Sequence, residues 1–253
     1  MARSISLSGA QVCEPLLHRV VTVVQVEEEN YRTKTLTTDL ELPAARPGQF
    51  AMVWLPGVNE KPLSLMDRAP VRFTVAAVGP FTRAMHALRP GDRLWVRGPF
   101  GNGYELRGRR AVLVAGGYGV APMYFLAREA LAQGLEVTVA VGARTRADLL
   151  FLSRFRALGV DLVLTTDDGS YGRRGLVTDA LDELLQGEYN RGAHVYACGP
   201  EPMLEAIQSL CIRLGIPAQL SWDRVMRCAM GLCGKCERNG WLVCRDGPVE
   251  IIS

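Results

Sequence analysis

Apolar residues in the first hundred positions fall into short runs separated by turn residues. The runs are rich in β-branched residues or alternate with polar ones, and they cover residues 20–26, 31–38, 49–55, 72–78 and 93–96. Pro47-Gly48 and Pro90-Gly91-Asp92 mark tight turns between them. Several short strands at this spacing predict a small antiparallel β-barrel over residues 1–106, with residues 1–15 as an N-terminal extension.

The pattern changes after the polar, basic stretch 106–110. Apolar strands are expected at 111–115, 135–141, 160–165 and 194–198, and helices between and after them at 122–133, 149–158, 176–185 and 202–214. Buried parallel strands joined by crossover helices make a doubly wound α/β sheet, which we expect over residues 107–220. Residues 221–253 form a third, cysteine-rich segment.

Composition narrows the possible functions. Of the 253 residues 48% are hydrophobic, so a substantial core can form, and the net charge is only +3. Neither a clustered basic surface nor a stacking platform for nucleic acid is indicated, since aromatic residues make up 7%. The longest uncharged apolar run, 111–127, is too short for a membrane span, and the first twelve residues hold no apolar block. We therefore expect a soluble, cytoplasmic protein with no nucleic-acid or membrane partner.

Four of the seven cysteines lie close together near the end of the sequence. Cys228, Cys233, Cys236 and Cys244 have the spacing C-x4-C-x2-C-x7-C, and the gap of four followed by a gap of two is the plant-type [2Fe–2S] order. Glycines within this segment let backbone amides turn toward the sulfurs. The alternatives are a four-cysteine zinc knot, which more often shows two C-x2-C pairs, and unligated thiols. The isolated Cys13 and Cys211 are most simply small apolar fillers.

Two glycine-containing loops follow strands of the predicted α/β sheet. Gly116, Gly117 and Gly119 precede a helix, and Cys198, Gly199 and Pro200 precede another. Ligands of open α/β sheets bind at the carboxyl ends of strands, and a helix N-terminus attracts a pyrophosphate. These residues are candidates for binding a dinucleotide, although either loop alone is also compatible with an ordinary strand-to-helix turn. Arg144 and Arg146 follow the second strand, so both NAD and NADP remain open.

The predicted barrel carries two further candidate segments. Lys61-Pro62-Leu63-Ser64 combines a cation, an extended backbone and a hydroxyl group, which together suit a phosphate and a ring edge. Residues 97–104 contain three glycines and an aromatic side chain, and this loop is a candidate for wrapping a planar cofactor. In isolation a solvated lysine and a turn serine are the simpler interpretation.

Taken together, these motifs resemble the ferredoxin–NADP reductase superfamily. They are Lys-Pro-Leu-Ser at 61–64, Gly-Pro-Phe-Gly-Asn-Gly-Tyr at 98–104, Gly-Gly-Tyr-Gly-Val-Ala-Pro at 116–122 and Cys-Gly-Pro-Glu-Pro-Met at 198–203. The cysteine segment with its Asp-Gly-Pro-Val tail at 246–249 resembles one branch of it, the electron-transfer subunit (PyrK) family of NAD-linked dihydroorotate dehydrogenase. The resemblance covers the chain after its first fifteen residues or so.

The resemblance implies cofactors and site residues. FAD would bind at Lys61, Pro62, Leu63 and Ser64, where Lys61 replaces the arginine of the family motif. The flavin-contacting strand and the phosphate-binding turn of the family match the following residues: Thr74, Val75, Ala76, Gly79, Phe81 and Thr82. NAD(H) would bind at the two loops of the α/β sheet, and the four clustered cysteines would ligate a [2Fe–2S] cluster. No side chain is expected to act as a catalytic acid or base.

The resemblance also implies a function and a partner. An FMN-containing dihydroorotate dehydrogenase catalytic subunit would pass electrons through the cluster and FAD to NAD, within a heterotetramer serving pyrimidine biosynthesis. One alternative is a flavin and iron–sulfur electron-transfer subunit of a hydrogenase, a sulfide dehydrogenase or a ferredoxin:NADP oxidoreductase. A second is a non-catalytic nucleotide-binding module stabilised by zinc.

Overall fold

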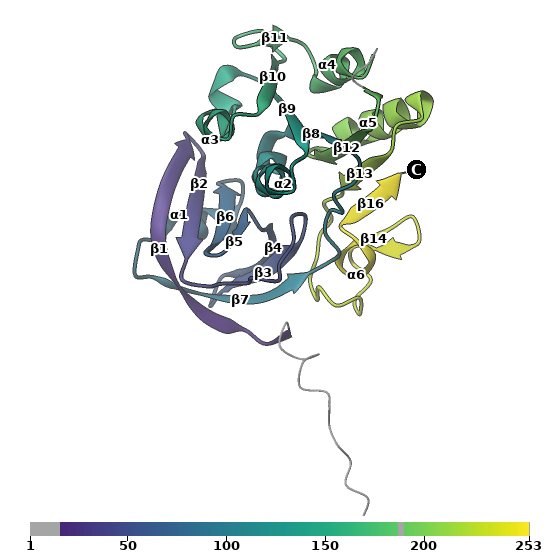
Figure 1. Cartoon of the computed structure of the whole chain (residues 1–253). Helices are drawn as coiled ribbons and strands as arrows, with labels where there is room; N and C mark the ends of the chain where they lie inside the picture. Colours follow the sequence, from purple (N-terminus) through teal and green to yellow (C-terminus); the bar gives the residue numbers. More distant parts are fainter. Residues whose placement is uncertain (1–15, 187–189, 253) are drawn as a thin grey trace, which may run out of the picture.

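A computed structural model describes residues 16–186 and 190–252 of the chain (Figure 1). The predicted extension 1–15, with Cys13, lies outside the described residues. The described part contains two seven-stranded sheets, one in each half of the sequence. The expected combination of an antiparallel β-barrel, a doubly wound α/β domain and a C-terminal cysteine segment is confirmed.

The first sheet is antiparallel and has the strand order β4-β3-β7-β1-β2-β6-β5. Its strands are β1 (Arg19–Asn30), β2 (Thr33–Thr38), β3 (Phe50–Leu55), β4 (Asn59–Ser64), β5 (Asp67–Arg68), β6 (Val71–Ala76) and β7 (Arg93–Phe100). Alternate side chains such as Val21, Leu36, Phe73 and Leu94 point inward and form its core.

Strands β4 and β5 and helix α1 (Pro80–Ala87) of the barrel were not expected from the pattern. Strand β4 contains Pro62, which has no backbone N–H, and the structure tolerates it because β4 lies at the edge of the sheet and pairs with β3 alone. Helix α1 begins with a proline in its first turn and buries Phe81 and Met85 in the barrel core.

The second sheet has the order β11-β10-β9-β8-β12-β13-β16 and is parallel except at β16. Its strands are β8 (Arg110–Gly116), β9 (Glu136–Ala143), β10 (Asp161–Thr166), β11 (Arg173–Arg174), β12 (Ala193–Cys198), β13 (Ala218–Ser221) and β16 (Val249–Ile252). Its helices are α2 (Val120–Ala132), α3 (Leu152–Ala157), α4 (Val177–Leu184) and α5 (Glu201–Leu214), with short 3-10 turns η2 (Gly117–Gly119) and η3 (Arg146–Asp148). Helix α3 is shorter than the expected 149–158, because Phe151 adopts a left-handed conformation just before it.

Helix α2 lies between the two halves of the molecule (Figure 1). Most of its residues are buried, and they pack on strands β8 and β9. Phe125 on the same helix instead belongs to the barrel core. The two hydrophobic cores therefore meet at this helix.

The cysteine segment is packed onto both halves rather than hanging as a tail. It contains β14 (Glu237–Arg238), β15 (Trp241–Leu242) and the short helix α6 (Val243–Asp246), and then β16 returns to pair with β13 of the α/β sheet. Its residues Met226, Ala229, Cys236, Val243 and Cys244 pack against Phe50, Met52 and Phe100 of the barrel. In the part of the chain described, no helix is both long enough and apolar enough to cross a membrane.

Candidate flavin, nucleotide and cysteine sites

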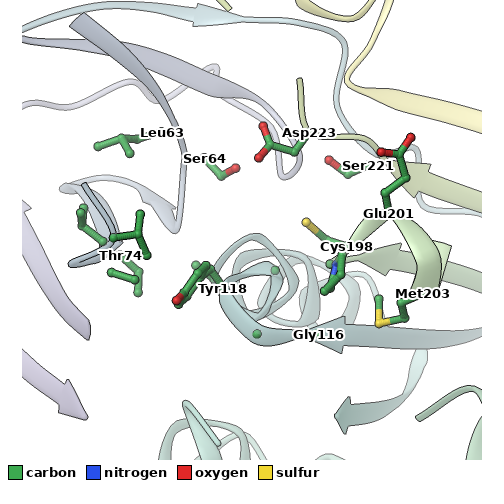
Figure 2. Close-up of a pocket in the computed structure, with 18 of the residues that line it drawn as sticks. Leu63, Ser64, Thr74, Gly116, Tyr118, Cys198, Glu201, Met203, Ser221 and Asp223 are labelled. Atoms are coloured by element: carbon green, nitrogen blue, oxygen red, sulfur yellow. The ribbon is translucent and has the colours of Figure 1, made fainter. Parts of the chain in front are cut away.

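A single large cavity of about 1310 Å³ lies where the barrel faces the carboxyl ends of the parallel strands (Figure 2). Drug-sized ligands occupy pockets of roughly 300–1,000 Å³, so this cavity has room for more than one such group. The residues that the resemblance assigned to FAD and NAD all line it: Lys61, Pro62, Leu63, Ser64, Thr74, Val75, Ala76, Gly79, Phe81, Thr82, Gly116, Gly117, Gly119, Cys198, Gly199 and Pro200. The fold thus brings together residues up to 139 positions apart in the sequence, from 61 to 200.

The barrel side of the cavity is formed by strands β4 and β6. Leu63, Ser64 and Thr74 face the cavity in the close-up (Figure 2). The Thr74 hydroxyl lies 2.9 Å from the hydroxyl of Thr35 and 3.4 Å from the sulfur of Met66. Rigid strands with a hydroxyl, a lysine and apolar side chains suit a planar, partly polar ring system with attached phosphates.

Thr82 shapes the start of helix α1 at the edge of the cavity. Its hydroxyl accepts hydrogen bonds from the backbone N–H groups of Val78 at 3.0 Å and Gly79 at 2.9 Å. A Cβ atom at Gly79 would meet nothing within 4 Å, so the backbone there is open to the cavity. Phe81 is largely buried in the barrel core, and it also lines the cavity.

The nucleotide side of the cavity is formed by two loops in direct contact. A Cβ atom at Gly119 would lie 2.0 Å from the carbonyl oxygen of Cys198, and one at Gly199 would lie 3.0 Å from the backbone nitrogen of Gly116. Gly117 has φ +54, and a Cβ there would meet nothing. Sequence reasoning assigned these glycines to close approach of a ligand; the structure shows that Gly119 and Gly199 let the two loops touch each other.

Three polar residues beside Cys198 were not singled out from the sequence. Ser221 and Asp223 line the cavity next to the Cys198 thiol (Figure 2). Tyr104 donates a hydrogen bond to the Ala197 carbonyl at 2.8 Å. Burial, reinforced by the negative charge of Asp223, raises the pKa of Cys198 to about 12. Burial also raises the pKa of Asp223. The thiol is therefore protonated at neutral pH and is not a thiolate nucleophile. Asp223 lies two residues after the end of β13, and its position near a strand end is the signal that could have found it.

Tyr118 was also missed, although it lies inside the predicted glycine loop. Its ring lines the cavity and is partly exposed, and the Arg32 guanidinium lies 5.6 Å from the ring centroid. Arg32 in turn donates to Asp148 at 2.7 Å, which joins the β1–β2 hairpin of the barrel to the turn after β9. An aromatic ring at this place can pack against a flat ligand group.

Arg144 and Arg146, the two arginines for which the sequence left the choice between NAD and NADP open, have different surroundings in the structure. Arg144 lines the cavity together with Asp148 and Asp167. Arg146 instead lies over the ring of Tyr171, at 5.4 Å from its centroid. The neighbouring Asp168 accepts hydrogen bonds from the backbone N–H and hydroxyl of Ser170, so residues 167–170 form a polar turn.

The four cysteines of the C-terminal segment are arranged as two pairs. The Cys233 amide points to the Cys228 sulfur at 3.5 Å, and the Cys244 amide points to the Cys236 sulfur at 3.4 Å. Within residues 16–186 and 190–252, no group of three or more His, Cys, Asp and Glu side chains is placed to hold one metal ion. Two pairs of thiols are the donor set of a dinuclear cluster, in which each iron takes two thiolates.

The electrostatics of the cysteine pairs also fit a cationic centre. Although burial raises it, hydrogen bonds from the backbone of Met230, Cys233 and Leu232 lower the pKa of Cys228 to about 6. Burial and the neighbouring Cys236 raise the pKa of Cys244 to about 12. Thiols gathered this closely can all ionise only if a positive centre neutralises them. The donor set thus fits an iron–sulfur cluster.

The glycine-rich loop that closes the barrel does not line the cavity, so its predicted contact with a planar cofactor is wrong. The Asn102 side chain donates to the Val249 carbonyl at 2.8 Å and accepts from the Val249 amide at 3.0 Å. A Cβ atom at Gly101 would lie 2.7 Å from the Gly247 carbonyl oxygen. The loop instead binds the C-terminal tail, which approaches too closely for any side chain.

Comparisons with known proteins agree with this architecture. Residues 113–209 match the family model described as "Oxidoreductase NAD-binding domain". The NADH-dependent reduced ferredoxin-NADP oxidoreductase, solved in connection with flavin-based electron bifurcation, superposes with a TM-score of 0.82 at 28% identity, covering 92% of this chain and 88% of that chain. The cytochrome b5 reductase domain of Ulva prolifera nitrate reductase shares the fold, with a TM-score of 0.68 at 20% identity over 80% of this chain and 95% of that one. The chain is therefore an oxidoreductase of the ferredoxin–NADP reductase type.

Curated relatives identify the family within this class. A probable dihydroorotate dehydrogenase B (NAD(+)) electron transfer subunit of Methanocaldococcus jannaschii is 41% identical, covering 93% of this chain and 89% of the relative. The protein of the same name from Pyrococcus horikoshii is 44% identical over 91% of this chain and 89% of the relative. The chain belongs to the family of dihydroorotate dehydrogenase B electron transfer subunits. The resemblance stated from the sequence motifs is confirmed.

Proposed function

We propose that the protein is the electron-transfer subunit of an NAD-dependent dihydroorotate dehydrogenase of pyrimidine biosynthesis. Electrons from the FMN of a separate catalytic subunit would pass through a [2Fe–2S] cluster and FAD to NAD. The working assembly would be a heterotetramer with that catalytic subunit, acting in the cytoplasm, where thiol ligands are kept reduced. The names of the curated relatives support this assignment.

The shared cavity is the observation that carries the proposal. It places the candidate flavin strands β4 and β6 opposite the two nucleotide loops (Figure 2). A bound flavin supplies hydride exchange with a nicotinamide and one-electron exchange with an iron–sulfur centre. The residues lining this cavity would therefore hold two flat rings face to face and keep water out.

Each side of the cavity has a distinct task in this proposal. On the barrel side, Lys61 would supply positive charge and Ser64 a hydroxyl group, while Gly79 and Thr82 would keep the start of α1 open to phosphates. Lysine provides a point charge rather than the two-pronged contact of an arginine.

On the nucleotide side, Gly116, Gly117 and Gly119 lead into the N-terminus of α2, where amide groups and the helix dipole favour a pyrophosphate. Cys198, Gly199 and Pro200 would border the nicotinamide. Because the Cys198 thiol is protonated at neutral pH, it would add bulk and polarity there without a negative charge.

The cysteine segment would connect this cavity to the partner. Cys228 and Cys233 would hold one iron, and Cys236 and Cys244 the other. Cys233 is exposed whereas Cys236 and Cys244 are buried against the barrel, so one edge of the centre is open to the outside.

Spectroscopy and reconstitution test the proposal. Anaerobically purified protein should contain FAD, iron and acid-labile sulfide, and its visible absorption should bleach with NADH. Mixed with an FMN-containing dihydroorotate dehydrogenase catalytic subunit, it should reduce NAD in the presence of dihydroorotate. A colourless protein containing zinc would support the non-catalytic module instead.

A second function is favoured by one observation, the likeness to the NADH-dependent reduced ferredoxin-NADP oxidoreductase. The same FAD, cluster and NAD sites would then serve ferredoxin rather than dihydroorotate. If the reconstituted mixture stays inactive with dihydroorotate while NADH reduces ferredoxin through this chain, the ferredoxin function replaces the first.

A further inference from the structure

An arginine lies buried at the junction between the barrel and the cysteine segment. Arg97 on β7 is 6% exposed, and its guanidinium contacts both sides of the junction. Nε and Nη2 donate to the two carboxylate oxygens of Glu60 at 2.6 and 2.9 Å. Nη1 donates to the carbonyl of Cys228 at 2.9 Å, and Nη2 lies 3.5 Å from the carbonyl of Arg227.

The carboxylate that holds Arg97 belongs to the strand with the candidate flavin residues. Glu60 directly precedes Lys61 on β4, and Lys61, Pro62, Leu63 and Ser64 line the cavity. Strand β3 lies between β4 and β7, with Trp54 opposite Glu60 and Met52 opposite Arg97. The Glu60–Arg97 pair therefore crosses β3 and joins the flavin strand to the first cysteine ligand.

The surroundings fix the geometry of this pair. Phe50, Met52 and Phe100 pack against the cysteine segment in an apolar cluster next to Arg97. The Arg97 guanidinium lies 5.3 Å from the Phe100 ring centroid, and His18 contacts Glu60 at 2.9 Å. A buried two-pronged arginine–carboxylate pair is held far more rigidly than an exposed one.

We propose that Arg97, held by Glu60, is the positioning residue of the cysteine centre. It fixes the loop carrying Cys228 at a set distance from the flavin strand, and its permanent charge stabilises the reduced, more negative form of the cluster. This inference rests on the proposed function, because it requires a cluster at the four cysteines. Charge and hydrogen bonds near a cluster are main determinants of its reduction potential.

The electrostatic role predicts shifts of opposite sign for the two partners. Arg97→Gln removes the cation and leaves Glu60, so the reduction potential of the cluster should become more negative. Glu60→Gln leaves the cation uncompensated, so the potential should become more positive. Arg97→Lys restores a charge and should return the potential most of the way to the wild-type value. Loosening of the loop alone would not produce opposite signs.

The experiment uses anaerobically purified full-length protein. Iron, acid-labile sulfide and FAD are quantified for each variant, and the reduced cluster is followed by electron paramagnetic resonance during a redox titration. Arg93→Gln is the matched control, because Arg93 is exposed at the start of the same strand. The control should keep the wild-type potential and spectrum.

The outcomes separate this inference from the proposed function. Potentials that shift in the same direction in Arg97→Gln and Glu60→Gln, or do not shift, overturn the positioning role. If Arg97→Gln fails to retain iron, the Glu60→Gln and Arg97→Lys variants test the positioning role. Wild-type reduction potentials and spectra in both of these variants would overturn that role. Wild-type protein that contains no iron or sulfide would instead refute the proposed function itself.

Discussion

Gly119 stands at the closest approach between the two nucleotide loops. The atoms that a Cβ would meet are the carbonyl oxygen and carbon of Cys198, at 2.0 and 2.4 Å, and both belong to the backbone. Backbone atoms cannot swing aside as a long side chain can, so relief requires the two loops to move apart. The shape of the nucleotide side of the cavity thus depends on the absence of a Cβ atom at Gly119.

Gly119→Ala is expected to separate the loops and weaken NADH binding by about tenfold or more, which corresponds to about 1.4 kcal/mol. The same overpacking should cost about 1–3 kcal/mol of folding stability. NADH titration of flavin reduction and thermal unfolding measure the two effects. Gly134→Asn is the control, because Gly134 has open space around it and asparagine tolerates its left-handed backbone. Equal affinity in Gly119→Ala and wild type would contradict the loop-contact argument.

His194 is a buried residue whose charge state is coupled to folding. The Gln219 amide donates to both the Glu105 carbonyl and the His194 Nε2 atom, at 2.6 and 3.1 Å, which requires a neutral imidazole with Nδ1 protonated. Burial, helped by the nearby charge of Arg107, lowers the pKa of His194 to about 4.

Because the folded-state pKa lies below the ordinary value, the stability contributed by His194 is complete above about pH 6.5. It falls as the pH drops toward 4, by at most about 1.4 kcal/mol per pH unit, since only the unfolded chain binds the proton there. Urea unfolding at pH 7 and pH 5 measures this loss. His194→Gln should show a smaller loss over the same interval, and an identical pH dependence in both proteins would refute the assignment.

At the scale of elements, helix α2 connects the two hydrophobic cores. Its N-terminus carries the glycine loop, and its buried face packs on the α/β sheet. Phe125 instead enters the barrel core, and Arg68 of β5 lies over its ring and pairs with Glu129 at 3.1 Å. The helix therefore couples the flavin side to the nucleotide side of the cavity.

Phe125→Ala is expected to destabilise the protein by about 3–5 kcal/mol, because it removes a fully buried ring at the junction of the two cores. The temperature at which FAD is released, followed by flavin fluorescence, should fall together with the unfolding midpoint. Leu131→Ala provides the comparison, as Leu131 is half-buried and contacts the α/β core alone. Release of FAD at the wild-type temperature would show that α2 does not couple the barrel.

At the scale of the whole molecule, the barrel, the α/β sheet and the cysteine segment all contribute residues to the large cavity. Residues 221–226 of the cysteine segment line that cavity, while β16 completes the α/β sheet and Asn102 of the barrel holds the tail. The cysteine centre is thereby fixed against both other parts. The flavin and cysteine sites are nevertheless formed by different residues.

Cys233→Ser tests whether the two centres can be separated. The variant should lose iron and sulfide and reduce electron delivery to the partner subunit by about tenfold or more. It should still oxidise NADH with an artificial dye that takes electrons directly at the flavin. Cys211→Ser is the control, since Cys211 is a buried residue of α5 and belongs to a different hydrophobic cluster from Cys236 and Cys244. Loss of both activities in Cys233→Ser would mean that the cluster is needed to hold the flavin site together.

The local sequence pattern predicted correctly those elements whose conformation depends mainly on their own residues. The β-branched runs, the strand–helix alternation and the spacing of the four cysteines each reflect a short-range requirement. Strand β4 and helix α1 were not predicted, because Pro62 and Pro80 are typical of turns. An edge strand and the first turn of a helix nevertheless tolerate proline. The loop 97–104 was misassigned because Gly101 and Asn102 contact the C-terminal tail, and the Asn102–Val249 contact spans 147 residues of sequence.

The sequence by itself determined the class of fold, the family and the residue types of the cofactor sites, because periodicity, turn chemistry and ligand spacing are written over a few neighbouring residues. Only the tertiary structure decided that Ser221 and Asp223 join Cys198, that Gly119 serves a loop contact, and that Arg97 connects the flavin strand to Cys228. Each of these contacts joins segments that are distant in the sequence, and its energy depends on how deeply the groups are buried and how closely they approach. Burial and interatomic distance are defined only in the folded chain.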